Sequence, residues 1–329
     1  MRSLLVLALA AIAFISGSNA WGQAASTSSG QAYPSRPIRL VLPIPPGGSP
    51  DVIARTLARQ IEIQLGQNII VDNRAGANGI IASVIVAKAA PDGYTVLHTP
   101  PSHILNALVY KQLQYDVFKD FIPVTNVASG VGYLLLVNPS LPAHSVRELI
   151  ALAKEKSLAY GSPPAGNTLH LAAELFNVRA GTQLRHIPYK GGSETFSALI
   201  SGEVQVLFVP PTAAMPYVKA GRLRALGFSG SKRFVDLPEV PTIAEAGVPD
   251  YIVDFTWNGW FAPAHTPAAI VNRLQAEVHQ ALQAPKVREV LAASAFYPVG
   301  STPEEFRKFI QVEMKRYAEM VREAKIPQQ

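Results

Sequence analysis

Short apolar runs alternate with helical patterns along most of the chain. In one helical pattern Ile53, Leu57, Ile61 and Leu65 recur at every fourth position, which indicates a single buried face. The first expected elements are strands at 38–44, 68–72 and 94–98 and helices at 50–65 and 79–90. This βαβαβ order predicts an α/β fold with a mainly parallel sheet flanked by helices.

The same alternation continues through the rest of the chain. The further expected strands are 121–127, 133–137, 159–162, 185–189, 204–208, 223–229 and 257–261, and the further helices are 102–110, 145–156, 168–176, 192–201, 212–221, 267–282 and one from 302 onward. A second α/β unit is thus inserted between two parts of the first, with crossings near 126–130 and 226–229. We expect domain 1 to comprise residues 33–127 and 227–329 and domain 2 to comprise residues 128–226.

Residues 1–20 have the features of a cleavable secretory signal peptide. Arg2 precedes an apolar run over residues 4–15, and residues 18–20 form a small-x-small cleavage pattern. The apolar run is too short to span about 30 Å of hydrocarbon. We expect residues 21–32, which are rich in Ser, Gly and Gln, to form a flexible leader, and we expect the mature protein to be exported to the periplasm.

Composition restricts the classes of partner. Removing Arg2 with the leader lowers the formal net charge from +6 to +5, because 29 basic residues become 28 against 23 acidic ones. The basic residues form no stripe interleaved with aromatic residues, so we expect no nucleic-acid partner. The absence of cysteine excludes disulfides and lipid attachment through cysteine.

Glycine- and proline-rich loops follow several of the expected strands. The loops at 45–51 and 73–79 each open a helix, whose first N–H groups lack helical partners and lie at the positive end of the helix dipole. Gly47 and Gly48 allow close backbone approach, and Ser49 is expected to cap the first helix. A single such loop is equally an ordinary strand-to-helix turn, but two neighbouring anion sites could hold one carboxylate. Further loops at 99–102, 163–167, 190–192 and 209–212 would surround the same cleft.

Few residues indicate catalysis. Ser229 and Lys232 match the Ser-x-x-Lys pattern of penicillin-recognising acyl enzymes, but the stretch leaves a strand and no Ser-Asp-Asn triplet accompanies it. We expect no enzyme activity, and an exported serine hydrolase using these two residues is the alternative.

The histidines have no metal-binding spacing, so we expect neither a metal nor another cofactor. His170, close to the expected helix cap Thr168, either packs to hold its loop or contacts a ligand. Lys190 either meets a ligand carboxylate or is a solvated charge beside a turn. Trp257 and Trp260 either wall a ligand or belong to the core.

Several longer motifs follow one another over essentially the whole mature chain. They are Tyr33-Pro34-x-Arg36-Pro37-Ile38, Pro43-x-Pro45-Pro46-Gly47-Gly48-x-x-Asp51-x-x-Ala54-Arg55, Asp72-Asn73-Arg74-x-Gly76-Ala77-x-Gly79, Pro91-Asp92-Gly93-Tyr94-Thr95, Gly166-Asn167-Thr168-Leu169-His170-Leu171, Pro188-Tyr189-Lys190-Gly191, Gly221-Arg222-Leu223-Arg224-Ala225-Leu226 and Leu237-Pro238-x-Val240-Pro241-Thr242. With these motifs the chain resembles the Bug (TctC-like) family, the extracytoplasmic solute receptors of tripartite tricarboxylate transporters.

The resemblance implies a two-lobed, type II-like periplasmic binding protein of the Venus-flytrap kind. Such a receptor closes over a small organic acid, a mono- or dicarboxylate, and delivers it to the membrane subunits of a tripartite tricarboxylate transporter. The family's ligand carboxylate is held largely by backbone N–H groups, hydroxyls and bridging waters of the first two loops. Ile44 stands where the family commonly has an aromatic residue, which leaves the identity of the solute open.

Together with the loop positions above, the resemblance gives a set of expected ligand-binding residues. They are Pro46, Gly47, Gly48, Ser49, Asp51, Ala77, Asn78, Gly79, Ser102, Gly166, Asn167, Thr168, His170, Tyr189, Lys190, Gly191 and Pro210. The fold type implies a monomer. A solute sensor for a membrane kinase is a further alternative to a transport receptor.

Overall fold

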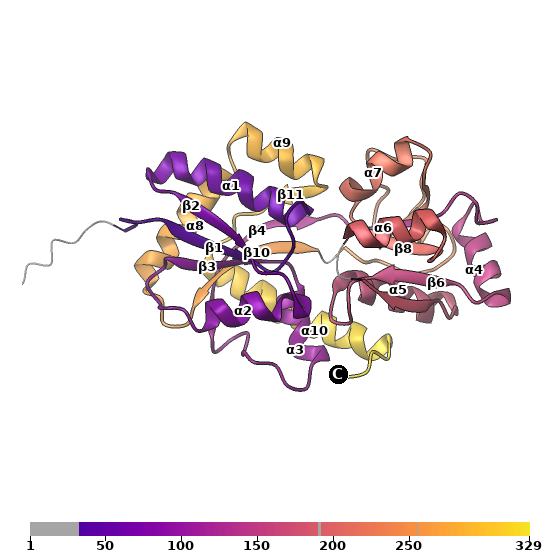
Figure 1. Ribbon diagram of the computed structural model, residues 1–329, viewed down its shortest axis with the longest axis horizontal. Coiled ribbons are helices and arrows are strands. Elements are labelled where there is room, and N and C mark those ends of the chain that lie inside the picture. The colour runs from indigo at the N-terminus through magenta and orange to yellow at the C-terminus, as the bar shows by residue number, and fades with distance from the viewer. Residues whose placement is uncertain (1–32, 190–191, 255) are drawn as a thin grey trace, which may run out of the picture. The chain divides into compact units, whose positions relative to one another are not determined.

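The computed structural model describes residues 33–189, 192–254 and 256–329, which contain two β-sheets flanked by helices (Figure 1). The first sheet contains β1 (Ile38–Leu42), β2 (Ile69–Asn73), β3 (Thr95–Thr99), β4 (Phe121–Gly130), β10 (Trp257–Pro263) and β11 (Phe296–Pro298), in the order β11-β4-β10-β3-β1-β2. The second contains β5 (Leu134–Val137), β6 (Ala159–Ser162), β7 (Arg185–Pro188), β8 (Val206–Val209) and β9 (Arg224–Phe228), in the order β7-β6-β8-β5-β9.

Both sheets are mixed, which corrects the prediction of mainly parallel sheets. β1 pairs in parallel with β2 and β3, whereas β10 is antiparallel to β3 and β4, and β11 is antiparallel to β4. In the second sheet β6 is parallel to β7 and β8, but β5 is antiparallel to β8 and β9. The antiparallel ladders occur where the chain passes from one sheet to the other and back. The predicted α/β class is confirmed.

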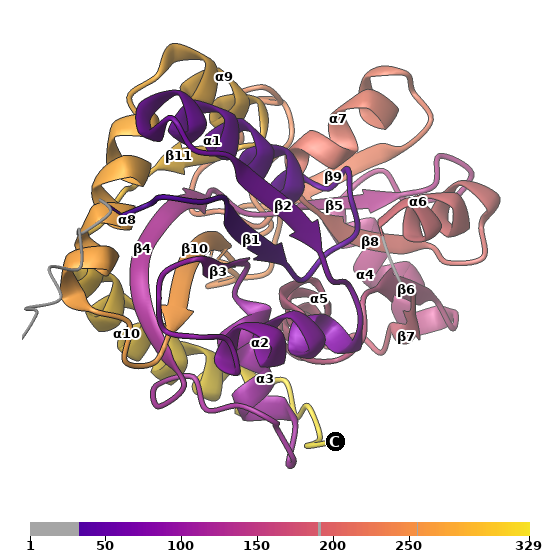
Figure 2. The same ribbon diagram turned by 60° about the vertical axis from the view of Figure 1, so that its left-hand side comes forward.

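Helices cover both faces of the first sheet (Figure 2). On one face lie α1 (Ser49–Leu65), α8 (Ala268–Ala281) and α9 (Pro285–Ala293), and on the other α2 (Ile80–Ala87), α3 (Ser102–Val109) and α10 (Pro303–Glu323). The second sheet is accompanied by α4 (Val146–Glu155), α5 (Thr168–Ala180), α6 (Gly192–Ser201) and α7 (Pro211–Lys219), and a short 3-10 helix, η1 (Ala77–Gly79), precedes α2.

Helix α1 illustrates how the sequence pattern produces a packed element. Ile53, Leu57 and Ile61 are buried in the cluster between this helix and the sheet. Gly66 ends the helix with a left-handed conformation (φ 63°), and its N–H donates to the carbonyl of Glu62. The predicted apolar face and the predicted end of α1 are therefore both present.

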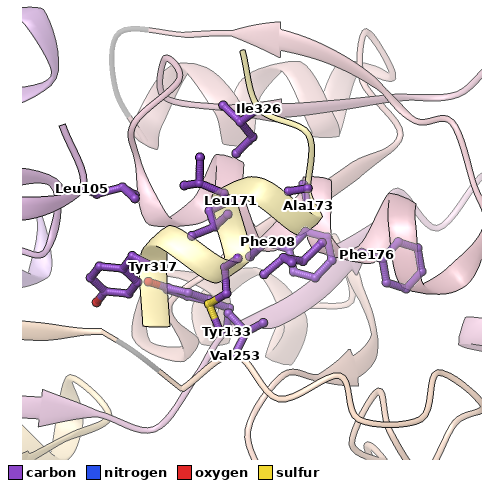
Figure 3. Close-up of a cluster of buried hydrophobic side chains, with 14 of the residues drawn as sticks. Leu105, Tyr133, Leu171, Ala173, Phe176, Phe208, Val253, Tyr317 and Ile326 are labelled. Atoms are coloured by element: carbon purple, nitrogen blue, oxygen red, sulfur yellow. The ribbon is translucent and has the colours of Figure 1, made fainter. Parts of the chain in front are cut away.

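One apolar cluster contains side chains from elements of both sheets. Leu105 of α3, Leu171 of α5, Phe208 of β8 and Tyr317 of α10 belong to it (Figure 3). At the end of α10, Glu323 accepts hydrogen bonds from Arg179 of α5 at 2.7 and 2.9 Å. Helix α10 thus packs beside the first sheet and also contacts α5 of the second, so both sheets share part of their core.

The chain passes from the first sheet to the second between Gly130 of β4 and Leu134 of β5, and it returns between β9 and β10. The residue boundaries of the two domains stay a prediction. No helix in the described ranges is both long enough and apolar enough to cross a membrane.

Several local predictions were wrong. The residues at the N-cap positions of α1 and α5 are Gly48 and Asn167, so the predicted caps Ser49 and Thr168 do not cap these helices. Helix α9 and strand β11 were missed, because both elements are short and α9 buries only Val287 and Leu291. The cap positions matter for the site, since each lies at the end of a loop.

Candidate functional site

The loop between β1 and α1 carries the first group of predicted site residues. Pro46, Gly47 and Gly48 are exposed, and Ser49 is half-buried at the first position of the helix. Among the described residues, the N–H groups of Gly48 and Ser49 have no hydrogen-bond partner. These two donors lie at the positive end of a helix dipole, which is a favourable place for an anion.

The buried carboxylate of Asp51 holds this loop in place through hydrogen bonds. Its Oδ2 accepts from the Gly47 N–H at 2.9 Å and from Arg55 Nε at 3.0 Å, and its Oδ1 accepts from Asn73 Nδ2 at 2.9 Å. Asn73 Nδ2 also donates to the Ile44 carbonyl at 3.0 Å. Asp51 is 2% exposed, so the geometry gives it a supporting role behind the loop.

The hydrogen bonds to Asp51 determine its ionisation. Burial by itself would raise the pKa of the carboxyl, but the hydrogen bonds from Arg55, Gly47 and Asn73 outweigh burial and hold the pKa below its ordinary value of 3.8. Asp51 is therefore a carboxylate at neutral pH.

The second loop has an unusual backbone conformation. Gly76, Ala77, Asn78 and Gly79 all have positive φ, at 131°, 45°, 50° and 88°. Left-handed conformations are costly for residues with a side chain and are concentrated at functional sites. The N–H groups of Ala77 and Asn78 have no partner among the described residues, and successive N–H groups in such a turn form a concavity that suits an anion.

The two loops of the first sheet are packed against each other. A Cβ added to Gly79 would lie 2.8 Å from Pro43 Cβ and 3.8 Å from Ser102 Oγ. Gly79 and Ser102 are both buried. Gly79 thus permits close approach of the loops, and Ser102 lies behind the second loop.

Loops of the second sheet contact these first two loops directly. Asn78 Nδ2 donates to Asn106 Oδ1 at 2.7 Å and lies 3.4 Å from the carbonyl of Ala165, which also accepts from Tyr110 at 3.0 Å. Asn106 Nδ2 returns a hydrogen bond to the Asn78 carbonyl at 3.1 Å. Gly166 has a φ of 86°, and a Cβ there would lie 2.8 Å from both asparagine side chains.

A second contact between the loops lies beside α1. Ser49 Oγ and Thr212 Oγ1, at the start of α7, are 3.0 Å apart and share a hydrogen bond. Pro210 is the residue before α7, and its carbonyl accepts from Ala213 and Ala214. The structure therefore brings the first, second, 163–167 and 209–212 loops together.

Three further predicted residues, Asn167, Thr168 and Tyr189, make hydrogen bonds within the protein. The Asn167 side chain accepts from the Leu169 N–H, and the Tyr133 hydroxyl donates to Thr168 Oγ1 at 2.8 Å. The Tyr189 hydroxyl donates to Glu203 at 2.8 Å. Lys190 and Gly191 lie outside the described residues.

His170 is buried, and its ring centre lies 4.5 Å from that of His186. Burial lowers the pKa of His170 to about 3, and His186 acts in the same direction. It is therefore neutral, which agrees with a packing role.

Several side chains at these loops were absent from the predicted set. Tyr110 and Thr212 make contacts between the sheets, and Asn106 holds the Asn78 side chain that makes another. Thr212 belonged to a loop expected at the cleft, but Asn106 and Tyr110 lay in a segment whose only signal was helical, so nothing in the sequence distinguished them.

Ser229, the proposed nucleophile of the hydrolase alternative, has a structural role. It is fully buried, its Oγ donates to the Val253 carbonyl at 2.6 Å and it accepts from the Tyr133 N–H at 2.7 Å. Lys232 is exposed. The described part of the chain also holds no group of three or more His, Asp or Glu side chains suited to a metal ion.

Sequence comparison identifies the family. The profile described as "Tripartite tricarboxylate transporter family receptor" (TctC) matches residues 53–326. The chain belongs to this family. A curated relative, the protein BugT of Bordetella pertussis, is 38% identical to the receptor over 303 residues, which is 91% of this chain and 92% of BugT. The predicted Bug (TctC-like) family is confirmed, and its members are periplasmic solute-binding receptors, not enzymes.

Solved structures agree with the fold of the receptor. An R. palustris protein with adipate is 36% identical with a TM-score of 0.85, and the match covers 90% of this chain and 99% of that one. MatC from Rhodopseudomonas palustris, with bound malate, is 29% identical with a TM-score of 0.81, covering 88% of this chain and all of that one (100%). The two-sheet fold of the receptor is therefore that of periplasmic binding proteins.

The contact at Gly166 gives a first prediction. Gly166→Ala adds a methyl group that Asn78 and Asn106 have no room for, whereas Gly181→Ala, at a φ of 64°, meets nothing within 4 Å. Both variants carry the backbone cost of a left-handed alanine, about 1–2 kcal/mol. Only Gly166→Ala should also separate the loops, seen as a larger radius of gyration in small-angle X-ray scattering. Equal radii for the two variants would contradict the packing described here.

A second prediction concerns Asp51 and pH. Because its folded pKa lies below 3.8, its ionised form stabilises the fold above about pH 4, and this contribution is lost as pH falls through the folded pKa. The difference in free energy of unfolding between the wild type and Asp51→Asn should be constant from about pH 5 to 7 and shrink toward pH 3. Denaturant unfolding measures it, and a difference that does not vary with pH would contradict the assignment.

Proposed function

We propose that this receptor captures a small mono- or dicarboxylate between the loops of its two sheets and delivers it to the membrane subunits of a tripartite tricarboxylate transporter. The observation that carries the proposal is the left-handed turn at residues 76–79, where the N–H groups of Ala77 and Asn78 have no partner within the described ranges. The adipate and malate of the two R. palustris structures support the same class of solute.

The proposed site binds charge by backbone donors. Gly48 and Ser49 of the first loop and Ala77 and Asn78 of the second would each donate an N–H to a carboxylate oxygen. Hydrogen bonds to a charged acceptor contribute more than neutral ones, about 1.5–3 kcal/mol each. The Gly166 loop and the segment around Lys190 would then meet the far end of the solute.

Two parts of the proposal concern transport. Residues 1–20 would direct export to the periplasm, where the mature chain acts as a monomer. The contacts of Ser49 with Thr212 and of Asn78 with Ala165 would form as the sheets approach each other over the solute, so that the membrane subunits recognise the closed receptor.

Thermal unfolding tests the solute class. The chain from residue 21, unfolded and refolded to remove carried-over ligand, is heated with adipate, malate or adipamide, the neutral diamide of adipate. A ligand that binds the folded state at a hundred times its Kd stabilises by about 2.7 kcal/mol, which raises the midpoint by about 5 °C or more. We expect a carboxylate to produce this shift and adipamide to produce none. An equal shift with adipamide, or none with any mono- or dicarboxylate of a wider panel, would contradict the proposal.

A further inference from the structure

His98 is a buried histidine that does not belong to the proposed site. It is the fourth residue of β3, it is fully buried, and it stands opposite Trp260 of β10 in the antiparallel ladder. Trp260 Nε1 donates to His98 Nδ1 at 3.0 Å. Trp260 packs in the same apolar cluster as Ile53 and Leu57 of α1.

The indole hydrogen bond fixes the tautomer of His98. An indole nitrogen is only a donor, so His98 Nδ1 must be an acceptor, and the neutral ring carries its hydrogen on Nε2. Burial lowers the pKa of His98 to about 4, against the opposing influence of the Asp51 carboxylate and the Pro50 backbone. The ring is therefore neutral at physiological pH, with one donor left.

The acceptors available to the Nε2–H group lie at the start of α1. Leu97 pairs with Val41 of β1, so His98 lies where β1 ends and the first loop begins. Val96 is on the same side of β3 as His98 and packs in the cluster that contains the α1 side chains, so His98 faces α1. The Pro50 backbone and the Asp51 carboxylate both act to raise the pKa of the ring, which agrees with this position. Nε2 is buried and makes no hydrogen bond of normal geometry within the described residues. A buried N–H is costly unless it is paired, so the Pro50 carbonyl and the Asp51 carboxylate are the acceptors that Nε2–H can use with a small shift of the loop.

We propose that His98 is a positioning residue: held by Trp260, it sets the first turn of α1 through Pro50 and Asp51, so that the Gly48 and Ser49 N–H groups point at the solute. The inference rests on the proposed carboxylate function. Two sets of contacts then hold the loop. Asn73 and Arg55 hold it through their hydrogen bonds to Asp51, and His98 holds it from β3.

Two matched variants test the roles of the two ring nitrogens of His98 separately. His98→Asn places an amide near the position of Nδ1 and keeps an acceptor for Trp260, but it does not reach α1. His98→Gln reaches the position of Nε2 with an N–H and loses the acceptor for Trp260. His144→Asn, at an exposed histidine before α4, is the control.

Adipate or malate binding is measured by calorimetry, with the indole N–H resonance of Trp260 and the unfolding midpoint recorded for each variant. We expect His98→Asn to keep the indole resonance and bind about tenfold more weakly, the effect of roughly one lost hydrogen bond. We expect His98→Gln to shift the indole resonance and bind within about threefold of the wild type. Wild-type affinity in His98→Asn, or affinity losses that only follow the unfolding midpoints, would overturn the proposal.

The wild type provides a test that needs no variant. In ¹⁵N-histidine spectra we expect His98 as the Nε2–H tautomer, with an Nε2 signal that moves when the carboxylate binds. A signal unchanged at saturation overturns the positioning role alone, because binding itself is then established. A wild type that binds none of the carboxylates overturns the positioning role together with the proposed function.

Discussion

The left-handed backbone of residues 76–79 is the constraint on which the site depends. Ala77 and Asn78 adopt a conformation that costs a residue with a side chain about 1–2 kcal/mol, and such a conformation persists only where its surroundings hold it. Here Gly79 packs on Pro43 on one side, and Asn78 is hydrogen-bonded to Asn106 on the other. The turn thereby fixes how the first two loops face each other.

The same turn connects the two sheets. Asn78 lies at the Ala165 carbonyl, and Gly166 leaves no space for a side chain between its loop and the asparagines. The sheets also share an apolar cluster that includes Tyr317 of α10, and α10 reaches α5 through the ion pair of Glu323 with Arg179. A change in the separation of the sheets would therefore alter the contacts of the turn, which carries the backbone donors.

Much of this arrangement could be predicted from the sequence, and the rest depends on long-range contacts. The spacing of Ile53, Leu57 and Ile61 predicts α1, and glycine-rich loops after strands predict where a ligand would sit. The sequence did not reveal that Gly48 instead of Ser49 takes the cap position, or that Asp51 points back into the protein. Asn106 carries no local signal, because its role arises only when α3 meets Asn78, which is 28 positions away in the chain. The assignment of residues to the ligand stays a prediction.

In the proposed binding mode, a carboxylate is held by the backbone N–H groups of the first and second loops. Two-dimensional ¹H–¹⁵N spectra of the refolded protein, titrated with adipate and with malate, test it most directly. We expect the amide protons of Gly48, Ser49, Ala77 and Asn78 to move downfield together at saturation, because N–H groups that gain a charged acceptor are deshielded. Saturable binding that leaves all four resonances in place would contradict it.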